Sequence, residues 1–450
     1  MKIPEKPPAT DEDVVKSLSE SKIDSKLIND LKSYLNIIDA DYMHWDELLV
    51  DDRFKGLDLV ERKKVWVIVK LFREISNRPI KLDGTALFYV QTPHIEKMLH
   101  DLDVRLGGKF DFDASLITGP DLRKKYLVNS LMEEAIASSQ LEGAVTTRPA
   151  AKKMLSEGRK PRNISEQMIL NNYVTMMYVK EPTQSDQNLT LELIKEIHKK
   201  ITKDTLEKKE YEGTFRTDNE VKVYSRSDSK LVYTPPHYND IDRLLQEVCN
   251  FANKRDSEGY YLHPFVKATV LHYMMGYIHP FNDGNGRTAR ALFYWYLISQ
   301  KYKSLEYVAV STAIKNAPAQ YMRAYLYSET DNNDITYFVK FNLRALDIAV
   351  TSFEKYIEKT SLENKKILET IRQNQKLNFR QADILIEMSK NEAPITIAEM
   401  KERYDITYQT ARTDLLGLKK LGYLQSFQKR KQFFFTLDKN KCMSVTENNK

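Results

Sequence analysis

The sequence predicts a mainly α-helical protein in which one β-hairpin interrupts the helices near the middle of the chain. Its 450 residues include only 14 glycines, a low count that favours helices. Most of the chain is amphipathic at helical spacing, whereas residues 213–236 break that spacing and contain short runs of alternating apolar and polar residues. Near the C-terminus, a helix, a turn, a second helix and a hairpin follow one another.

Composition indicates an ordered protein of the cytoplasm with no membrane partner. Hydrophobic residues make up 42% of the chain and charged residues 29%, and the net charge of +6 does not by itself imply a nucleic-acid partner. Cys249 and Cys442 are the only cysteines, too few for a disulfide framework or a zinc-binding CxxC pair. The polar start lacks a signal-peptide core, and the longest apolar stretch, 291–298, is too short to span a bilayer.

The length of the chain predicts more than one domain. We expect a flexible tail, a helical N-terminal domain, a segment containing one long helix, a catalytic domain and a C-terminal domain. These parts are assigned to residues 1–20, 21–118, 119–160, 161–358 and 360–440. Helices are predicted at 58–74, 92–106, 121–141, 164–179, 191–201, 239–253, 263–278, 287–299 and 335–358. A capping box of Asn163 with Glu166, and Thr190 as a cap, mark two of the starts.

The stretch from 213 to 236 predicts a β-hairpin. Val221 and Val223 alternate with Lys222 and Tyr224, a polar turn follows at 225–230, and residues 231–233 form the returning strand. The alternative is a hairpin with a purely structural role.

The segment 279–290, His-Pro-Phe-Asn-Asp-Gly-Asn-Gly-Arg-Thr-Ala-Arg, predicts a phosphate site. Gly284 and Gly286 lie where a helix begins, so backbone N–H groups and the helix dipole point at one place. Asn285 can add a side-chain donor there, and Asp283 offers an oxygen ligand suited to Mg²⁺ already bound to phosphates.

Three further side chains of the segment suit catalysis. Arg287 and Arg290 lie about one turn apart and can both face a polyphosphate. The near-neutral pKa of His279 lets it take a proton from an alcohol. A lone glycine pair usually marks a turn and a lone histidine is usually structural, but together these residues supply the parts needed for nucleotidyl transfer to a hydroxyl.

In this segment the sequence resembles the Fic family of protein adenylyltransferases, whose HPFxDGNGRxxR signature it matches in full. The resemblance implies a Fic-type helical core with His279 as general base and Asp283 as Mg²⁺ ligand. It implies that Gly284, Asn285 and Gly286 form an anion hole, that Arg287 and Arg290 bind the β- and γ-phosphates of ATP, and that Phe281 anchors the loop. The intact glycines favour transfer of AMP with release of pyrophosphate.

The resemblance extends to the hairpin, which matches the family's flap, and to residues 213–216 before it. It implies that Val221, Lys222, Val223 and Tyr224 pair with a segment of the target protein through backbone hydrogen bonds. The modified residue is then a Ser, Thr or Tyr of that partner.

The sequence Ser138-Ser-Gln-Leu-Glu142-Gly143 is similar to the family's inhibitory motif. Ser138 and Glu142 are four residues apart and share a helix face. The resemblance implies that Glu142, at the helix end, reaches Arg290 and occupies the arginine meant for the γ-phosphate. This predicts the class with an N-terminal inhibitory helix. The alternative is an ordinary solvent-facing glutamate, and a further hypothesis is that Glu142 helps water remove AMP from a modified target.

The last segment has the outline of a winged helix. Thr396 with Glu399 and Thr407 predict two helix starts, residues 411, 415, 418 and 421 share a face, and 425–437 predicts a hairpin. Basic residues at 412, 419, 420 and 429–431 suit DNA contact by residues 396–437. The alternative is a packing or dimerisation module, so a homodimer, a DNA-binding regulator with a nucleotide-sensing core and a relic scaffold remain open.

Overall fold

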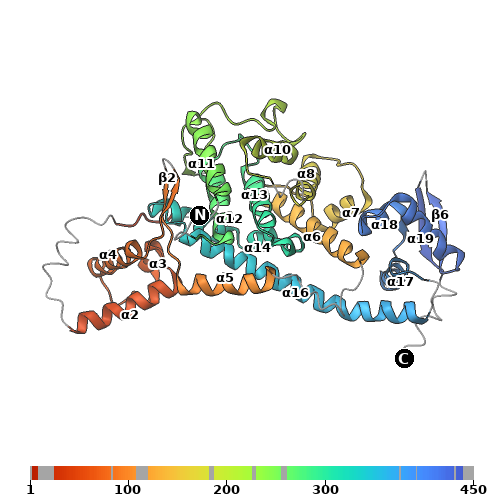
Figure 1. Cartoon of the computed structure of the whole chain (residues 1–450), viewed down its shortest axis with the longest axis horizontal. Helices are drawn as coiled ribbons and strands as arrows, with labels where there is room; N and C mark the ends of the chain where they lie inside the picture. The colour runs from red at the N-terminus through yellow and green to blue at the C-terminus, as the bar shows by residue number, and fades with distance from the viewer. Residues whose placement is uncertain are drawn as a thin grey trace.

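The longest element of the protein is α16, Thr336–Gln373, which extends for about 57 Å. In the computed structural model it runs beneath the other elements, with the N-terminal helices towards one end and the C-terminal elements at the other (Figure 1). The structure describes residues 3–8, 25–82, 85–107, 120–181, 187–224, 230–254, 261–373, 377–391, 393–429 and 432–438. The helix was expected to end at 358, so the predicted boundary between the catalytic and C-terminal domains falls inside a continuous helix.

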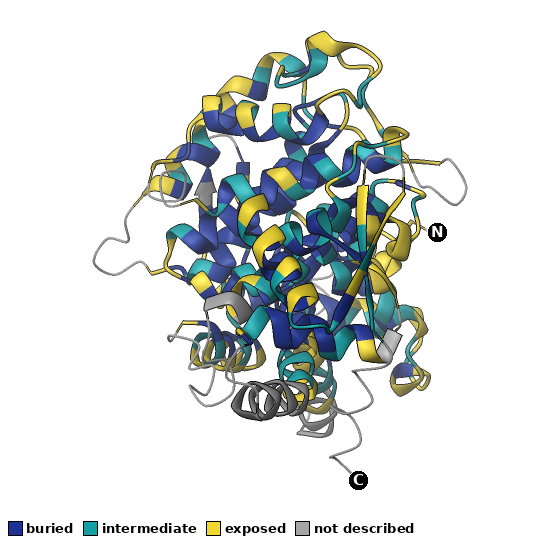
Figure 2. Ribbon diagram, turned by 90° about the vertical axis from the view of Figure 1, so that its right-hand side faces the viewer, coloured by how far each residue is buried: buried dark blue, intermediate teal, exposed yellow. Residues whose placement is uncertain are grey.

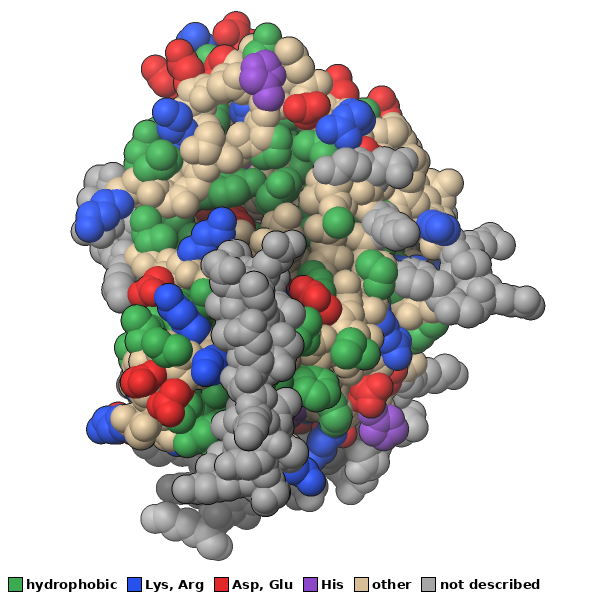
Figure 3. Space-filling model, turned by 90° about the vertical axis from the view of Figure 1, so that its left-hand side faces the viewer, with side chains coloured by type: hydrophobic (Ala, Val, Ile, Leu, Met, Phe, Trp, Pro, Cys, Tyr) green, Lys and Arg blue, Asp and Glu red, His purple; other side chains and the backbone are tan. Residues whose placement is uncertain are grey.

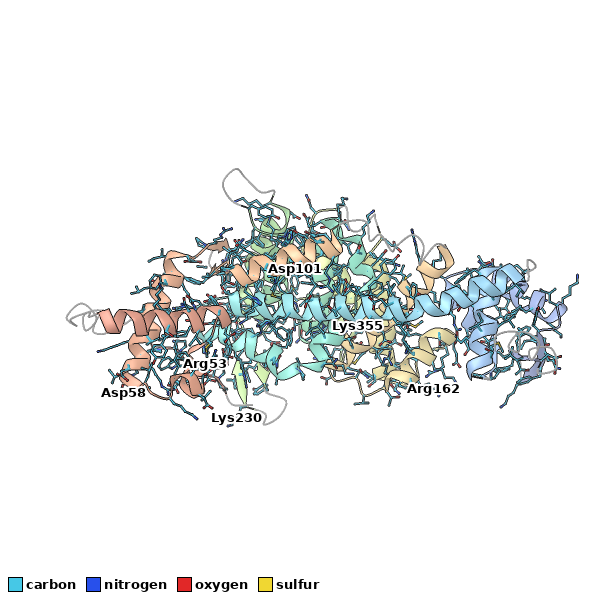
Figure 4. All side chains as sticks on the ribbon, turned by 90° about the horizontal axis from the view of Figure 1, so that it is seen from below. Arg53, Asp58, Asp101, Arg162, Lys230 and Lys355 are labelled. Carbon is cyan, nitrogen blue, oxygen red and sulfur yellow. The ribbon has the colours of Figure 1, made fainter. Side chains whose placement is uncertain are left out.

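A small separate core lies at the N-terminal end. It is built by α2 (Ser25–Asp41), α3 (Trp45–Val50), η1 (Asp52–Phe54) and α4 (Leu59–Ile75). Trp45, Phe54 and Trp66 are buried at its centre. Arg53 and Asp58 lie at this end of the molecule, whereas Lys355 lies near the middle of α16 (Figure 4). The end face mixes apolar and charged side chains (Figure 3).

A buried ion pair ties α4 to the main body. The Lys70 ammonium lies 2.9 Å from an Asp331 carboxylate oxygen, and Asp334 accepts a hydrogen bond from the Tyr42 hydroxyl at 2.8 Å. All four residues are buried, and charges in such a place are tolerated when they are paired. The N-terminal core is therefore fixed to the start of α16.

Apolar side chains of 80–82 and 85–106, among them Ile80, Leu87 and Leu99, pack in the main core, although this stretch was assigned to the N-terminal domain. The stretch forms the antiparallel pair β1 (Ile80–Leu82) and β2 (Thr85–Leu87), followed by α5 (Pro93–Leu106), whose N-cap is Thr92. The helix α5 was predicted; the strand pair was not. Each of its strands has three residues, too few to display a period of two against the helical pattern around them.

Three helices and α10 (Leu191–Thr202) lie on one side of the loop 279–284, which is called the catalytic loop for the role that the sequence predicts. The three are α6 (Pro120–Leu141), α7 (Arg148–Glu157) and α8 (Ile164–Val179). Thr190 caps α10 and the Asn163 side chain caps α8, as predicted. The predicted capping box is only half formed, because Glu166 bonds the guanidinium of Arg159 and the backbone of Arg162 instead of Asn163.

Two helices buried on almost every side pass through the middle of the protein. They are α12 (Pro264–Ile278) and α13 (Asn285–Ser299). Figure 2 shows this interior as largely buried ribbon. Around them lie η2 (Lys209–Tyr211), β3 (Val223–Tyr224), β4 (Leu231–Tyr233), η3 (Tyr238–Asp240), α11 (Ile241–Asn253), η4 (Lys303–Tyr307), α14 (Val310–Asn316) and α15 (Pro318–Thr330). A helix that is apolar all round must be covered by others, and these elements supply the cover.

The C-terminal module has its own core. Its elements are α17 (Phe379–Asn391), β5 (Ile395–Thr396), α18 (Ile397–Tyr404), α19 (Tyr408–Lys420), β6 (Leu424–Lys429) and β7 (Gln432–Leu437), with sheet order β5-β7-β6. The two predicted helices, their caps and the hairpin are all present. The hairpin tip at 430–431 lies outside the described residues. Of the three phenylalanines at 433–435 only Phe435 is fully buried: Phe434 faces the opposite side of β7, and Phe433 shares the side of Phe435 but lies near the tip of the hairpin. The winged-helix assignment stays a prediction.

No helix within the described ranges is both long enough and apolar enough to cross a bilayer.

Candidate active site

The catalytic loop connects the two central helices. The helix α12 ends at Ile278 and is capped by His279, whose backbone is left-handed (φ 49°, ψ 57°), and α13 begins at Asn285. Gly284 precedes it with φ 84°, and a Cβ there would lie 2.7 Å from Thr202 and 3.2 Å from His198. Both the dihedral angle and the available space require glycine at this position.

The loop is held from inside by Asn285. Its side-chain oxygen accepts a hydrogen bond from the Phe281 amide at 3.0 Å, and its side-chain nitrogen donates to the Phe281 carbonyl at 2.7 Å. The Asn285 side chain is buried, and one of its two N–H donors is used within the loop, so its donation to a phosphate stays a prediction. Its amide also shapes the loop.

A histidine on α10, His198, supports the loop from below. Its ring stacks on Phe281 with 3.6 Å between centroids, and Nε2 donates to the Asp283 carbonyl at 2.8 Å. Nδ1 accepts from the Gly213 amide at 2.9 Å. Burial lowers the pKa of His198 to about 4, so the ring is neutral and this tautomer is fixed. The sequence analysis missed His198, because a single histidine on the apolar face of a helix has the pattern of a core residue.

Arg216 closes the loop from the side of the hairpin. Its amide donates to the Pro280 carbonyl at 2.8 Å, and its guanidinium donates to the carbonyls of His279 at 3.0 Å and Pro236 at 2.5 Å. The left-handed backbone at His279 is therefore stabilised by neighbours rather than by local preference. Residues 213–216, singled out by the resemblance, thus bind the loop directly.

His279 has the chemistry of a base. Its Nδ1 lies 3.2 Å from the Gly276 carbonyl oxygen, which can only accept, so Nδ1 carries the proton. Nε2 is then the unprotonated nitrogen, and it has no hydrogen-bond partner among the described residues. Burial lowers the pKa of His279 below its usual value of 6.5, so the ring stays neutral at physiological pH.

Glu142 lies on the N-terminus of α13. Its carboxylate accepts a hydrogen bond from the Arg290 guanidinium at 2.8 Å, and a Cβ added to Gly286 would lie 2.1 Å from its Oε1 atom. Arg290 also donates to the Ser138 hydroxyl at 2.8 Å and to the Ser138 carbonyl at 3.0 Å. The first N–H groups of a helix have no intrahelical acceptor and attract anions. A carboxylate thus occupies the place where a phosphate oxygen would be favoured.

The two arginines of the loop point at different partners. Arg290 is buried, and although burial lowers its pKa, Glu142, Tyr321 and Glu134 together outweigh that effect and raise the pKa above its usual value. Arg287 reaches Asp283 at 3.3 Å and the Ile201 carbonyl at 3.5 Å, and its buried Nε has no hydrogen-bond partner. Burial lowers the pKa of Arg287. Of the two, Arg287 is the cation whose charge is less well compensated.

The exposure of the Asp283 side chain suits the role of Mg²⁺ ligand that the resemblance implies. This side chain is 62% exposed, with one carboxylate oxygen accepting from the Gly284 amide and the other 3.3 Å from Arg287. The described part of the chain contains no group of three or more His, Cys, Asp or Glu side chains arranged around a metal site. A cation at Asp283 would take its other ligands from phosphates and water.

The flap is shorter than expected. Val223 and Tyr224 form β3 and pair with β4, whereas Val221 and Lys222 lie outside the strand, and residues 225–229 lie outside the described residues. Tyr233 of β4 donates to the Tyr277 carbonyl at 3.0 Å, which fixes the hairpin beside the end of α12. Tyr224 is 51% exposed on the outer edge. Of the four predicted docking residues, two thus belong to a strand with an open side.

The third inhibitory residue, Gly143, follows Glu142 with φ 100°, in the region that favours glycine. A Cβ at this position would meet nothing within 4 Å, so the dihedral angle rather than space accounts for glycine here. Gly143 turns the chain away directly after the residue that contacts Arg290.

The fold and the site define a helical protein with an anion-binding position at the N-terminus of α13. The Glu142 carboxylate occupies this position, beside the neutral imidazole of His279. Residues 188–297 match the sequence model of the Fic/DOC family, and the chain therefore contains a Fic domain. This stretch includes the flap, His279 and the loop, whereas Ser138 and Glu142 lie before it.

Curated relatives carry the name protein adenylyltransferase Fic. The one from Nematostella vectensis is 25% identical over 264 residues, which span 57% of this chain and 56% of that protein. The one from Drosophila grimshawi is 31% identical over 136 residues, 30% of this chain and 25% of that protein. The matches thus cover about half of the first relative and a quarter of the second. A crystal structure of a Fic family protein from Desulfovibrio desulfuricans G20 aligns with 78% of this chain and 98% of its own, at 19% identity and a TM-score of 0.49.

The contact between Gly286 and Glu142 yields a prediction about stability. Alanine at 286 places a methyl group against the Glu142 carboxylate, so we expect Gly286→Ala to break the bridge to Arg290 and destabilise the protein by about 1–3 kcal/mol. Glu142→Gly removes the obstacle, so the same alanine should cost little in that background. Thermal unfolding of the four proteins of this cycle measures the coupling, and equal losses in both backgrounds would contradict it.

Proposed function

We propose that the chain transfers AMP from ATP to a Ser, Thr or Tyr hydroxyl of a target protein and releases pyrophosphate. The observation that carries this proposal is the anion-binding position at the N-terminus of α13, where the Glu142 carboxylate is bound to Arg290 beside His279. A phosphate fits where a carboxylate already lies. The relatives named protein adenylyltransferase Fic support the same activity.

Each residue of the loop has a separate role in the proposed reaction. His279 Nε2 takes the proton of the target hydroxyl, whose oxygen forms a bond to the α-phosphorus while the bond from that phosphorus to the β-phosphate oxygen breaks. The backbone amides at the start of α13 stabilise the charge that develops, since they are oriented before the reaction begins. Asp283 would hold Mg²⁺, which neutralises phosphate charge when bound. The flap strand β3 offers its open side to a segment of the target.

Glu142 is the proposed inhibitory residue, and its contact with Arg290 is called the brake below. Bound to Arg290, Glu142 denies the γ-phosphate its cation, and it also fills the space above Gly286. Arg290 is buried and Glu142 is largely shielded, so a nucleotide must displace a pair that is costly to separate. ATP would then bind in a pose that does not present its α-phosphorus to His279.

Replacing His279 tests the base. We expect His279→Ala to reduce AMP transfer at least about 100-fold, because proton removal is lost, while ATP still binds with similar affinity. Labelled-ATP transfer and equilibrium binding of a fluorescent ATP analogue measure the two properties. His100→Ala, which changes an exposed histidine on α5, is the control. Undiminished transfer by His279→Ala would remove the base assignment.

Replacing Glu142 tests both the brake and the proposed activity. We expect Glu142→Gly to raise AMP transfer about tenfold or more, because Arg290 and the space above Gly286 become available. Mass spectrometry of lysate proteins after incubation with ATP would find a mass gain equal to AMP and identify the target. Glu181→Gly, which changes an exposed glutamate just past the end of α8, is the matched control. Wild-type transfer by Glu142→Gly would refute the brake. Release of AMP from a modified target by the wild-type chain would favour the reverse reaction.

A second candidate function is DNA contact by the C-terminal module. Arg412, Lys419 and Lys420 are exposed on α19, and Lys429 is exposed at the end of β6. A row of basic side chains on the outward side of the second helix suits duplex phosphates. We expect the full chain to shift a duplex DNA of mixed sequence at low salt, and to lose this property when Arg412, Lys419 and Lys420 become Ala. No shift at low salt would exclude the candidate.

A further inference from the structure

The C-terminal module touches the helix that carries the brake. Its helix α18 packs against α6 and α7, so the module is attached to the rest of the protein by more than its connection to α16. The Glu402 carboxylate of α18 lies 3.3 Å from the position of a Cβ on Gly158, just past the end of α7. Figure 1 shows α18 beside α7 and the start of α6, and Figure 4 shows Arg162 on the side facing the module.

A second link between the C-terminal module and α6 is an ion pair between α6 and α17. The Lys125 ammonium lies 2.7 and 3.0 Å from the two carboxylate oxygens of Asp383. Asp383 is 7% exposed and also accepts a hydrogen bond from the Tyr404 hydroxyl. Beside it, the Lys124 ammonium donates to the Asp405 carbonyl at 3.1 Å. Without Lys125, this largely buried carboxylate would lose its ion-pair partner on α6 and keep only the Tyr404 hydroxyl and the nearby charge of Arg403, both within the module.

The other half of α6 contacts the catalytic site. Buried Glu134 accepts hydrogen bonds from the Tyr294 hydroxyl and the Ser311 amide, both at 2.8 Å, which ties α6 to α13 and α14. One turn further on, Ser138 contacts Arg290, and Glu142 follows the last residue of the helix. Lys125 and Glu142 are separated by about 25 Å along one uninterrupted helix. A shift of the helix at one end therefore displaces the side chains at the other.

We infer that Lys125 and Asp383 are positioning residues for the inhibitory helix, through which the C-terminal module sets how firmly Glu142 holds Arg290. This inference rests on the proposed function, and it adds that the brake is under the control of a separate module. With the pair intact, α6 is held from both ends and Glu142 stays at the N-terminus of α13. With the pair broken, the packing of α18 and the Lys124 contact still hold this end of α6, but less firmly, and the population with Arg290 free for a phosphate rises.

The test uses the full chain with two substitutions on opposite sides of the contact. We expect Lys125→Met and Asp383→Asn each to raise AMP transfer to lysate proteins and affinity for a fluorescent ATP analogue about fivefold or more. Lys125→Arg keeps the charge and should behave as wild type. Arg105→Met is the matched control, because Arg105 is equally exposed (23%) and pairs Glu354 and Asp347 on α16 without touching α6.

Measurements in the Glu142→Gly background distinguish a positioning role of Lys125 from a merely structural one. There the brake is absent, so Lys125→Met should add no further gain in transfer or ATP affinity. The inference fails if both substitutions match wild type while Glu142→Gly is activated, or if Lys125→Met gains as much in the Glu142→Gly background. If Glu142→Gly transferred no AMP, the proposed function would fall, and the change in ATP affinity would still decide the role of the pair.

Discussion

The organisation of this protein depends on one buried guanidinium, that of Arg290. It extends from the first turns of α13 into the side of α6, where Ser138 and Glu142 supply three acceptors. Such a cation must be compensated, since an unpaired charge in the interior is costly. When α6 is in place the compensation comes from Glu142, and in the proposed reaction it comes from a phosphate. In the proposed function one arginine thus serves both the resting and the active state, and the exchange of its partner is the proposed switch.

A second requirement is that the loop keeps its shape whichever anion is present. Its backbone turns sharply at His279 and Gly284, and no local preference would hold His279 in a left-handed conformation. Groups from three separate parts of the chain hold it: the amide of Asn285, the ring of His198 and the guanidinium of Arg216. Each of them bonds loop backbone, so the side chain of His279 remains available for chemistry. The loop is held by the surrounding chain, and the proposed function requires only that the anion exchanges.

Much of this could be predicted from sequence, because local patterns encode it. Helix caps at Asn163, Thr190 and Thr396 are visible in the residues themselves, and the segment 279–290 contains its own chemistry. The contact between Glu142 and Arg290 was predicted only through resemblance, since the two are far apart in the chain. The side-chain pairing of Asn285, the support by His198 and the pair Lys125–Asp383 could not be read from sequence. They depend on which helices become neighbours, and neither spacing nor composition records that.

The claim that Arg290 exchanges a carboxylate for a phosphate is tested most directly by a crystal structure of the Glu142→Gly chain with Mg·ATP carrying a non-hydrolysable α,β bridge. The account predicts the terminal phosphate within hydrogen-bonding distance of the Arg290 guanidinium, phosphate oxygens against the amides of Gly286 and its neighbours, and the α-phosphorus facing His279 Nε2. A triphosphate lying elsewhere, with Arg290 still turned only towards Ser138, would contradict it.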